Sequence, residues 1–176
     1  MSVPVLFVLL PNVLMLDLAG PAEVLRLAAQ SEDPAALDFD LQYVSPVPSL
    51  QTSIGLPLAG LAPLPPSLAP GTLVVLVGST SKVSKAQQQA FESASDTLTQ
   101  WLQSVFAASG QRLVCVCAGA LSAARAGLLD GRQCTTHHAL CEALQALAPK
   151  ARVLENRLYV TDGPVSCSAG VTAGID

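Results

Sequence analysis

Cys117 is the residue of this sequence that most clearly carries chemistry. It follows an apolar, β-favouring run at residues 113–116 and precedes three small residues at 118–120, an order that predicts a strand, a tight turn and a helix. Backbone N–H groups at the start of such a helix favour a thiolate. The pattern follows the logic of a nucleophile elbow, with Gly119 two residues after the cysteine and Cys115 where a glycine usually precedes it. We predict a reactive thiol at Cys117; the alternative is a buried cysteine packed beside Cys115.

Asp17 is a candidate acid in an early loop. Residues 3–10 form a near-continuous apolar run, which is typical of a strand covered on both faces. Gly20 and Pro21 precede a run of apolar residues, so a helix is predicted to begin at Pro21. Asp17 then lies at the carboxyl end of the strand, where open α/β sheets bind ligands; the alternative is a helix-capping or loop aspartate. Glu23 has a similar choice between a site role and the helix dipole.

Gly78 and Ser79 are candidate ligand-contacting residues after another strand. Residues 72–77 are apolar and predict a second doubly covered strand. A glycine at its end lets backbone N–H groups face a small substrate or anion. Residues 87–107 carry apolar side chains at three- and four-residue intervals, which predicts an amphipathic helix on the sheet.

The remaining segments complete a pattern of alternating strands and helices. A proline-rich surface excursion separates residues 38–44 from the strand at 72–77. The predicted elements are a strand at 38–44, an edge hairpin at 52–58 around Gly55, a helix at 139–147, a hairpin of 151–159 with 164–168 through Asp162 and Gly163, and the start of a helix after residue 168. Such alternation predicts a three-layer α/β/α sandwich, with one site above the strand ends.

Length and composition favour one domain over residues 1–176, with a single well-buried core. Hydrophobic residues make up 51% of the chain and charged residues 12%. The net charge of -4 argues against nucleic-acid binding by this domain itself, because phosphate contacts need a basic face. The apolar run at residues 3–10 is too short to span a membrane.

Five cysteines and the lack of a recognisable secretion signal predict a reducing, cytoplasmic location. Cys134, His137, His138 and Cys141 crowd one short stretch, but their spacing fits no standard zinc pattern. We therefore expect no metal and no cofactor.

Three stretches of the chain resemble the ThiJ/PfpI superfamily, which has the class I glutamine-amidotransferase-like fold. They are LDLAGPAEVL at residues 16–25, VCAGALSAARAGLLDGRQCTTHH at 116–138 and YVTDGPVSCSAGVTAGID at 159–176. Two branches are most similar: the isocyanide hydratases and the amino-terminal domains of AraC-type transcriptional regulators. The resemblance implies a flavodoxin-like, mainly parallel sheet with a cysteine nucleophile elbow, and a homodimer. The last stretch is more similar to the regulators, in which a helix-turn-helix DNA-binding domain follows.

The resemblance also implies roles for individual residues. Cys117 matches the elbow cysteine, and Asp17 matches the acid that hydrogen-bonds it in the hydratases. His137 matches the histidine of a TTH motif; a loop histidine bonded to backbone is the alternative. Gly78 matches the first glycine of an oxyanion turn, and Gly20, in the first stretch, is a further candidate ligand contact.

Three positions depart from the family pattern. His138 stands where the TTH motif is usually followed by Trp, Ser79 replaces the second glycine of the oxyanion turn, and Ala118 replaces the Thr that hydratases carry beside the nucleophile. The last two changes remove groups from the reacting centre, where one positioned donor contributes about two or three powers of ten in rate.

These departures favour a domain that binds without turnover. The first hypothesis is the sensor domain of an AraC-type regulator, excised from a longer chain, with a small molecule beside Cys117 and DNA bound only by a domain absent here. Its predicted ligand contacts are Gly78, Ser79, Ala118, His137 and Gly20. The alternatives are a hydratase that adds water to an isocyanide through Cys117 and Asp17, and a redox or stress protein with an oxidisable Cys117.

Overall fold

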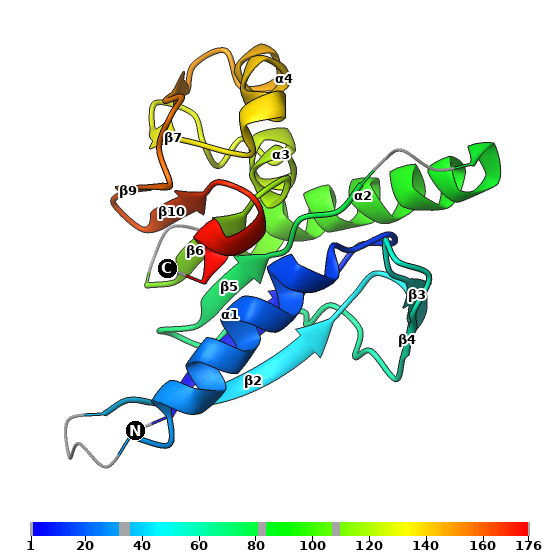
Figure 1. The fold of residues 1–176 in the computed structure, drawn as a ribbon, viewed down its shortest axis with the longest axis vertical. Coiled ribbons are helices and arrows are strands. Elements are labelled where there is room, and N and C mark those ends of the chain that lie inside the picture. The colour runs from blue at the N-terminus through cyan, green and yellow to red at the C-terminus, as the bar shows by residue number, and fades with distance from the viewer. Residues whose placement is uncertain (1, 32–35, 81–83, 107–109, 176) are drawn as a thin grey trace.

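A six-stranded sheet forms the centre of the computed structural model, which describes residues 2–31, 36–80, 84–106 and 110–175. The strands follow the order β2-β1-β5-β6-β10-β9 (Figure 1). Their bounds are Ser2–Val8 for β1, Asp38–Val44 for β2, Leu73–Leu76 for β5, Arg112–Val116 for β6, Tyr159–Asp162 for β9 and Val165–Ser168 for β10. All neighbours pair in parallel except β9, which is antiparallel to β10. The sheet is therefore mainly parallel, as predicted.

Helices cover both faces of this sheet. Helix α1 (Met15–Ala28) crosses one face, and α2 (Lys85–Val105) and α3 (Gly119–Arg125) lie on the other (Figure 1). The alternation along β1 explains why its sequence is apolar throughout: Val5 and Phe7 pack in the cluster that contains Leu18 of α1, whereas Leu6 packs in the cluster that contains Leu98 of α2. The three-layer α/β/α prediction is confirmed.

The predicted start of the first helix is wrong by six residues. Helix α1 begins at Met15, and Pro21 lies inside it. Proline removes one backbone N–H from the helical ladder, but burial of Leu18 and Ala22 on either side of Pro21 stabilises the helix across that gap. Asp17 consequently lies in the first helical turn and not in a loop.

Two short hairpins match their turn signals. Strands β3 (Ser49–Gln51) and β4 (Pro57–Ala59) pair antiparallel around Gly55, which has φ +83°. Strands β9 and β10 form a hairpin in the predicted region, with Gly163 at φ +60° in the turn, but its first strand is Tyr159–Asp162 and not the predicted 151–159. Both glycines adopt a left-handed conformation that larger residues rarely take.

The elements outside the main sheet are shorter than predicted. Residues 151–159 form no continuous strand, because β8 (Arg152–Val153) pairs with β7 (Gln133–Cys134) in a separate two-stranded sheet and the chain then turns back toward β9. The helix predicted at 139–147 is a 3₁₀ turn, η1 (His138–Leu140), followed by α4 (Cys141–Leu147). The predicted helix after residue 168 is the 3₁₀ turn η2 (Val171–Gly174). Residue 107, at the end of the helix predicted over 87–107, and residue 176 lie outside the described residues.

Among the described helices, none combines the length and the apolar character that crossing a membrane requires.

Candidate functional site

Cys117 lies at a strained corner between β6 and α3. Its φ is +54°, a left-handed conformation that costs a non-glycine residue about 1–2 kcal/mol. The Cys117 N–H donates to the Ser168 carbonyl oxygen at 3.2 Å, which ties the corner to the end of β10. A side chain at Gly119 would collide with the Leu76 carbonyl group, so the small residues after the cysteine let α3 start directly against β5. The predicted strand-turn-helix is present.

Asp17 and Cys117 meet beneath Gly78. A Cβ atom on Gly78 would collide with the Asp17 carboxylate and would lie 3.0 Å from the Cys117 Cβ. Asp17 is 2% exposed and Cys117 is 4% exposed, and the thiol and the carboxylate form a hydrogen bond. The end of β5, the first turn of α1 and the corner after β6 therefore bring three of the sequence-predicted residues together.

The thiol of Cys117 is not the thiolate that its position at a helix start favours. Burial, followed by the negative charge of Asp17, raises the pKa of Cys117 to about 12. The backbone N–H of Ala118 acts in the opposite direction and lowers the pKa, but by less than burial and the Asp17 charge raise it. At neutral pH the sulfur is therefore a protonated thiol, which corrects the expectation drawn from the helix terminus alone.

Gly170 lies against both the Cys117 sulfur and the His137 ring. A Cβ atom on Gly170 would lie 2.9 Å from the Cys117 Sγ and 2.5 Å from the His137 Cδ2. The His137 Nδ1 accepts from the Ala139 N–H at 3.3 Å, so the ring is also bonded to backbone. The Cys117 sulfur and the His137 ring therefore both border the space that a side chain at position 170 would occupy.

The other predicted contact residues are distributed around this centre. Ser79 forms an isolated bridge with Val13, which places it on the strand-end side of Gly78. His138 stacks on His137 with ring centroids 4.2 Å apart. Gly20 lies within α1, where its Cβ position faces Ile175 Cγ1 at 2.6 Å. Its predicted ligand contact stays a prediction.

Three site residues were not predicted from the sequence. Gly170 contacts the sulfur, Ser168 receives the Cys117 N–H, and the Thr136 hydroxyl donates to the Cys117 carbonyl oxygen at 2.7 Å. The glycine in SAGVTAG could have indicated a close approach of backbone. No sequence pattern reports the two hydrogen bonds, because they join residues that are far apart in the chain.

A cavity of about 410 Å³ opens next to His137, and we call it the His137 cavity. Its walls are residues 135–138 and 156–158 together with Cys141, Ala169 and Gly170. Arg157 is a cation on this wall, and no Asp or Glu lines it. Cys117 does not line it, and the sulfur adjoins the cavity only through Gly170 and His137.

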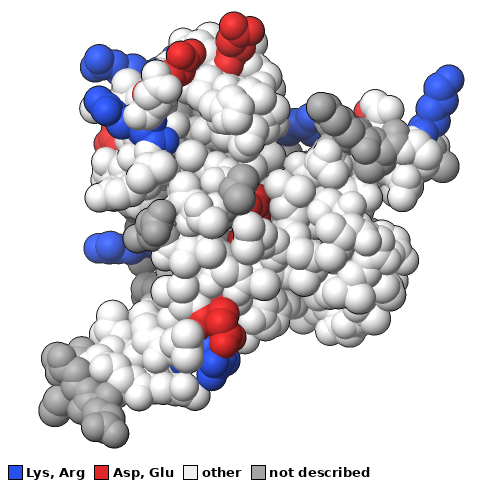
Figure 2. Space-filling model, in the orientation of Figure 1, with Lys and Arg blue, Asp and Glu red and all other residues white. Residues whose placement is uncertain are grey.

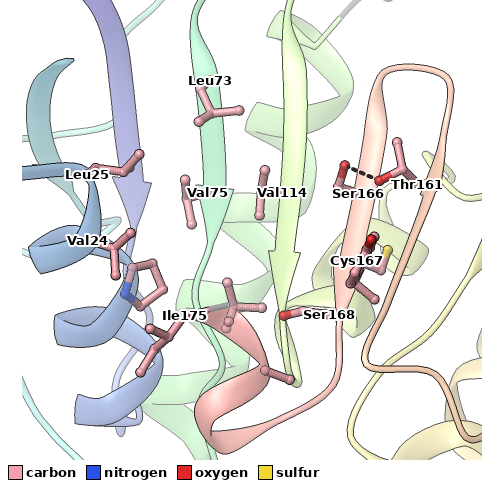
Figure 3. Close-up of a pocket in the computed structure, with 15 residues that line it drawn as sticks. Val24, Leu25, Leu73, Val75, Val114, Thr161, Ser166, Cys167, Ser168 and Ile175 are labelled. Carbon is pink, nitrogen blue, oxygen red and sulfur yellow. Dashed lines mark hydrogen bonds between the residues drawn. The ribbon is translucent and has the colours of Figure 1, made fainter. Parts of the chain in front are cut away.

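A second, apolar hollow of about 340 Å³ lies on the sheet face beside α1 (Figure 3), and we call it the sheet groove. Val75 and Val114 form part of its floor, α1 forms one wall, and residues 173–175 and the β9–β10 hairpin close it. Thr161 and Ser166 share a hydrogen bond of 2.9 Å at its edge (Figure 3). The Ser168 Oγ is buried here without a hydrogen-bond partner among the described residues.

Three of the other thiols, those of Cys115, Cys134 and Cys167, belong to a different core cluster from Cys117. Cys115 is the register partner of Cys167 in the neighbouring strand, and both belong to the core cluster under α2 and α3 with Cys134. Cys117 packs in the cluster on the α1 side. Within the described part of the chain, no three His, Cys, Asp or Glu side chains gather as metal ligands, including those at 134–141.

The model of the DJ-1/PfpI family matches residues 4–176. The chain belongs to the DJ-1/PfpI family. This confirms the resemblance seen in the three sequence stretches.

The curated proteins that are similar to this chain are of two kinds. The chain is 40% identical over 79 residues to the HTH-type transcriptional regulator CdhR and 40% identical over 70 residues to the HTH-type transcriptional regulator GbdR, both of Pseudomonas aeruginosa. It is 41% identical over 73 residues to isonitrile hydratase of Pseudomonas putida. These matches span 45%, 40% and 40% of this chain but only 23%, 19% and 29% of the relatives.

Solved structures share the fold of this DJ-1/PfpI chain over nearly its whole length. An AraC family transcriptional regulator from Pseudomonas putida superposes with a TM-score of 0.76 at 21% identity, covering 99% of this chain and 87% of that one. A ThiJ/PfpI family protein from Pseudomonas syringae gives 0.74 at 20% identity, with 100% and 66% covered. The flavodoxin-like α/β architecture is thus that of the family.

Proposed function

We propose that this chain is the ligand-sensing domain of an AraC-type transcriptional regulator and that a small molecule binds in the His137 cavity, beside Cys117. The observation that carries the proposal is the state of Cys117: it is 4% exposed and burial and Asp17 raise its pKa to about 12. A pKa that far above neutrality keeps the sulfur protonated at pH 7. A site of this kind suits recognition better than covalent catalysis.

Two of the curated relatives support the regulatory reading, because their names describe HTH-type transcriptional regulators. Since the matches cover less than a quarter of those proteins, we propose that residues 1–176 are one domain of a longer chain and that DNA is bound by another domain. The face in Figure 2 is mostly uncharged, with Lys and Arg at its margins, and the net charge is -4. Phosphate contacts require a basic face instead.

We propose that the ligand carries a carboxylate or a similar anionic group. Arg157 lines the His137 cavity, whereas no Asp or Glu does, so a carboxylate bound there would meet a cation. Glu155 is the nearby negative charge, and it acts on Cys141 in the same wall. The His137 and His138 rings and Asn156 add polar groups along the same wall. A cavity of about 410 Å³ suits a small metabolite.

The segment after β10 offers a route by which binding could be transmitted. Ala169 and Gly170 line the His137 cavity, and residues 173–175 line the sheet groove. A ligand that displaces Gly170 would move η2 and change the shape of the groove. Sensing requires such a difference in ligand affinity between two states.

We further propose a cytoplasmic homodimer. Five free cysteines fit a reducing compartment. Exposed apolar side chains, Leu16 at 46%, Leu27 at 53% and Ile54 at 73%, provide surface that association could bury. Sedimentation of the purified chain would measure the oligomeric state.

The test of the sensing proposal is a binding screen with a built-in chemical control. Small carboxylic acids and their matched primary amides are compared by thermal shift and calorimetry. We expect stabilisation by carboxylates only, and loss of that effect when Arg157 is replaced by Gln. Binding of amides as tightly as acids, or the absence of any binder, would contradict the proposal.

A hydratase is the second candidate, because isonitrile hydratase is 41% identical over 73 residues. In that case Asp17 would take the thiol proton as the Cys117 sulfur adds to the isocyanide carbon and would pass it to that carbon, and water would then cleave the carbon–sulfur bond to give the formamide and the free thiol. Formamide production from tert-butyl isocyanide, present in the wild type and lost in Cys117→Ala, would establish this activity over sensing.

A redox role is the third candidate and has a separate assay. Mass spectrometry after mild peroxide treatment would report oxygen addition at Cys117. Selective oxygen addition at Cys117 would favour the redox role. The protonated, buried thiol leads us to expect none.

A further inference from the structure

We infer that Thr136 is a positioning residue that holds Cys117 in its left-handed conformation through one buried hydrogen bond. The inference deepens the proposed role of Cys117 and rests on it for its biological importance. Thr136 is 2% exposed, and its Oγ1 donates to the Cys117 carbonyl oxygen at 2.7 Å. The two residues are 19 positions apart in the chain, so the bond joins the corner after β6 to the segment that follows β7.

Both the N–H and the carbonyl group of Cys117 form hydrogen bonds, and Thr136 supplies the shorter of the two that reach the carbonyl oxygen. The Cys117 N–H donates to the Ser168 carbonyl oxygen at 3.2 Å. The Cys117 carbonyl oxygen receives the Ala120 N–H at 3.4 Å, a long contact, and the Thr136 hydroxyl at 2.7 Å. A short hydrogen bond in a buried setting constrains the orientation of the peptide plane more than a long one.

This constraint matters because Cys117 has φ +54°, which persists only where surrounding contacts enforce it. The same conformation directs the thiol into its buried position between Asp17, Gly78 and Gly170. If the Thr136 bond is removed, the peptide is free to relax and the sulfur can leave the Asp17 carboxylate. Exposure of the sulfur to water and its separation from Asp17 both lower the pKa of the thiol.

The chain supplies a matched control at the adjacent position. Thr135 is 1% exposed, and its Oγ1 donates to a backbone carbonyl oxygen, that of Leu154, at 2.8 Å. Thr135→Val and Thr136→Val therefore each remove one buried hydroxyl and one hydrogen bond of similar length. Only the second removes a contact to Cys117.

The experiment measures how fast iodoacetamide alkylates each cysteine, resolved by mass spectrometry between pH 7 and 10.5. The thiolate sulfur displaces iodide, so the rate reports both exposure and ionisation. We expect Cys117 of the Thr136→Val variant to be alkylated about ten-fold faster than Cys117 of the wild type at pH 8. The rate in the variant should also begin to level off at a lower pH than in the wild type. Thr136→Ser, which keeps the hydroxyl, and Thr135→Val should remain within about two-fold of wild type.

A general loss of stability would give a different pattern. Urea titrations compare the stability of the two Val variants, and alkylation is repeated in low urea to detect labelling through unfolding. Equal Cys117 rates in Thr136→Val and Thr135→Val, or failure of Thr136→Ser to retain the wild-type rate, would overturn the inference. If Thr136→Val does not fold, Thr136→Ser and Thr136→Ala replace it, because that pair differs only in the hydroxyl.

The alkylation assay tests the role of Thr136 independently of the sensing proposal. The alkylation assay contains no ligand, so an unchanged Cys117 rate leaves the carboxylate screen unaffected. A negative ligand screen likewise leaves the alkylation result standing.

Discussion

Asp17 and Cys117 lie against each other in the space that a side chain at position 78 would occupy. The carboxylate comes from the first turn of α1 and the thiol from the corner after β6. The contact has an electrostatic consequence, because the charge of Asp17 opposes ionisation of the sulfur.

Replacing Asp17 by Asn should therefore activate the thiol. The amide keeps the shape of the side chain but removes the negative charge that helps to raise the pKa of Cys117. We expect the alkylation rate of Cys117 at pH 8 to rise about ten-fold, which corresponds to about one pKa unit. Asp130→Asn is the control, since Asp130 is paired with exposed Lys150 away from the thiol. An unchanged rate in Asp17→Asn would show that burial, without the charge of Asp17, raises the pKa of the Cys117 thiol.

Stability should decline at alkaline pH. Burial is the main cause that raises the pKa of Cys117 and of Cys134 to about 12 each, from an ordinary value of 9.0. Below pH 9 both the folded and the unfolded chain hold these protons, so the two thiols add no pH dependence. Above pH 9 the unfolded chain releases them first, and the free energy of unfolding falls by about 1.4 kcal/mol per thiol and pH unit until pH 12.

Urea denaturation under reducing conditions at pH 8, 9.5 and 10.5 checks this slope. The Cys117→Ala variant isolates the share of one thiol, since it should lose less stability than the wild type between pH 8 and 10.5. Parallel slopes for the two proteins would contradict the pKa assigned to Cys117.

Gly170→Ala should disturb the site sterically. The added methyl group would lie 2.9 Å from the Cys117 Sγ and 2.5 Å from the His137 ring, and overpacking of this kind costs about 1–3 kcal/mol. Gly20→Ala is the matched control, because its Cβ meets the flexible Ile175 side chain. We expect Gly170→Ala to lower the urea midpoint more than Gly20→Ala. The reverse order would argue against close packing between Gly170 and the sulfur.

Arg157→Gln should weaken binding of a carboxylate ligand. A charge-assisted hydrogen bond contributes about 1.5–3 kcal/mol, so the dissociation constant should rise at least about ten-fold. Arg152→Gln is the control, since Arg152 does not line the His137 cavity. Calorimetry of both variants with the same acid provides the measurement. A similar loss in both would point to long-range charge and not to a contact.

The sequence was sufficient for the elements with strong local patterns. The apolar run at residues 3–10 and the small residues at 118–120 predicted the doubly covered β1 and the corner at Cys117, because burial and close backbone approach leave local signatures. The order of strands and helices, with the family resemblance, also predicted the three layers.

The errors arose where distant contacts override local signals. Pro21 suggested a helix start, but packing of Leu18 and Ala22 extends α1 back to Met15. The helix-start position of Cys117 suggested a thiolate, but burial beside Asp17 keeps the proton on sulfur. The roles of Thr136 and Gly170 depend on contacts with residues that are distant in the chain and approach only after folding. The local sequence around each residue therefore does not indicate these contacts.

Gly119 has a mechanical consequence for any ligand-driven change. Because a methyl group at this position would strike the Leu76 carbonyl, the start of α3 and the end of β5 are in backbone-to-backbone contact and cannot slide without a clash. We therefore expect the start of α3 to move little when a ligand binds. Ligand-dependent displacement is expected in the flanking segments around residues 135–138 and 169–175, where hydrogen exchange should report it while the amides of α3 stay unchanged.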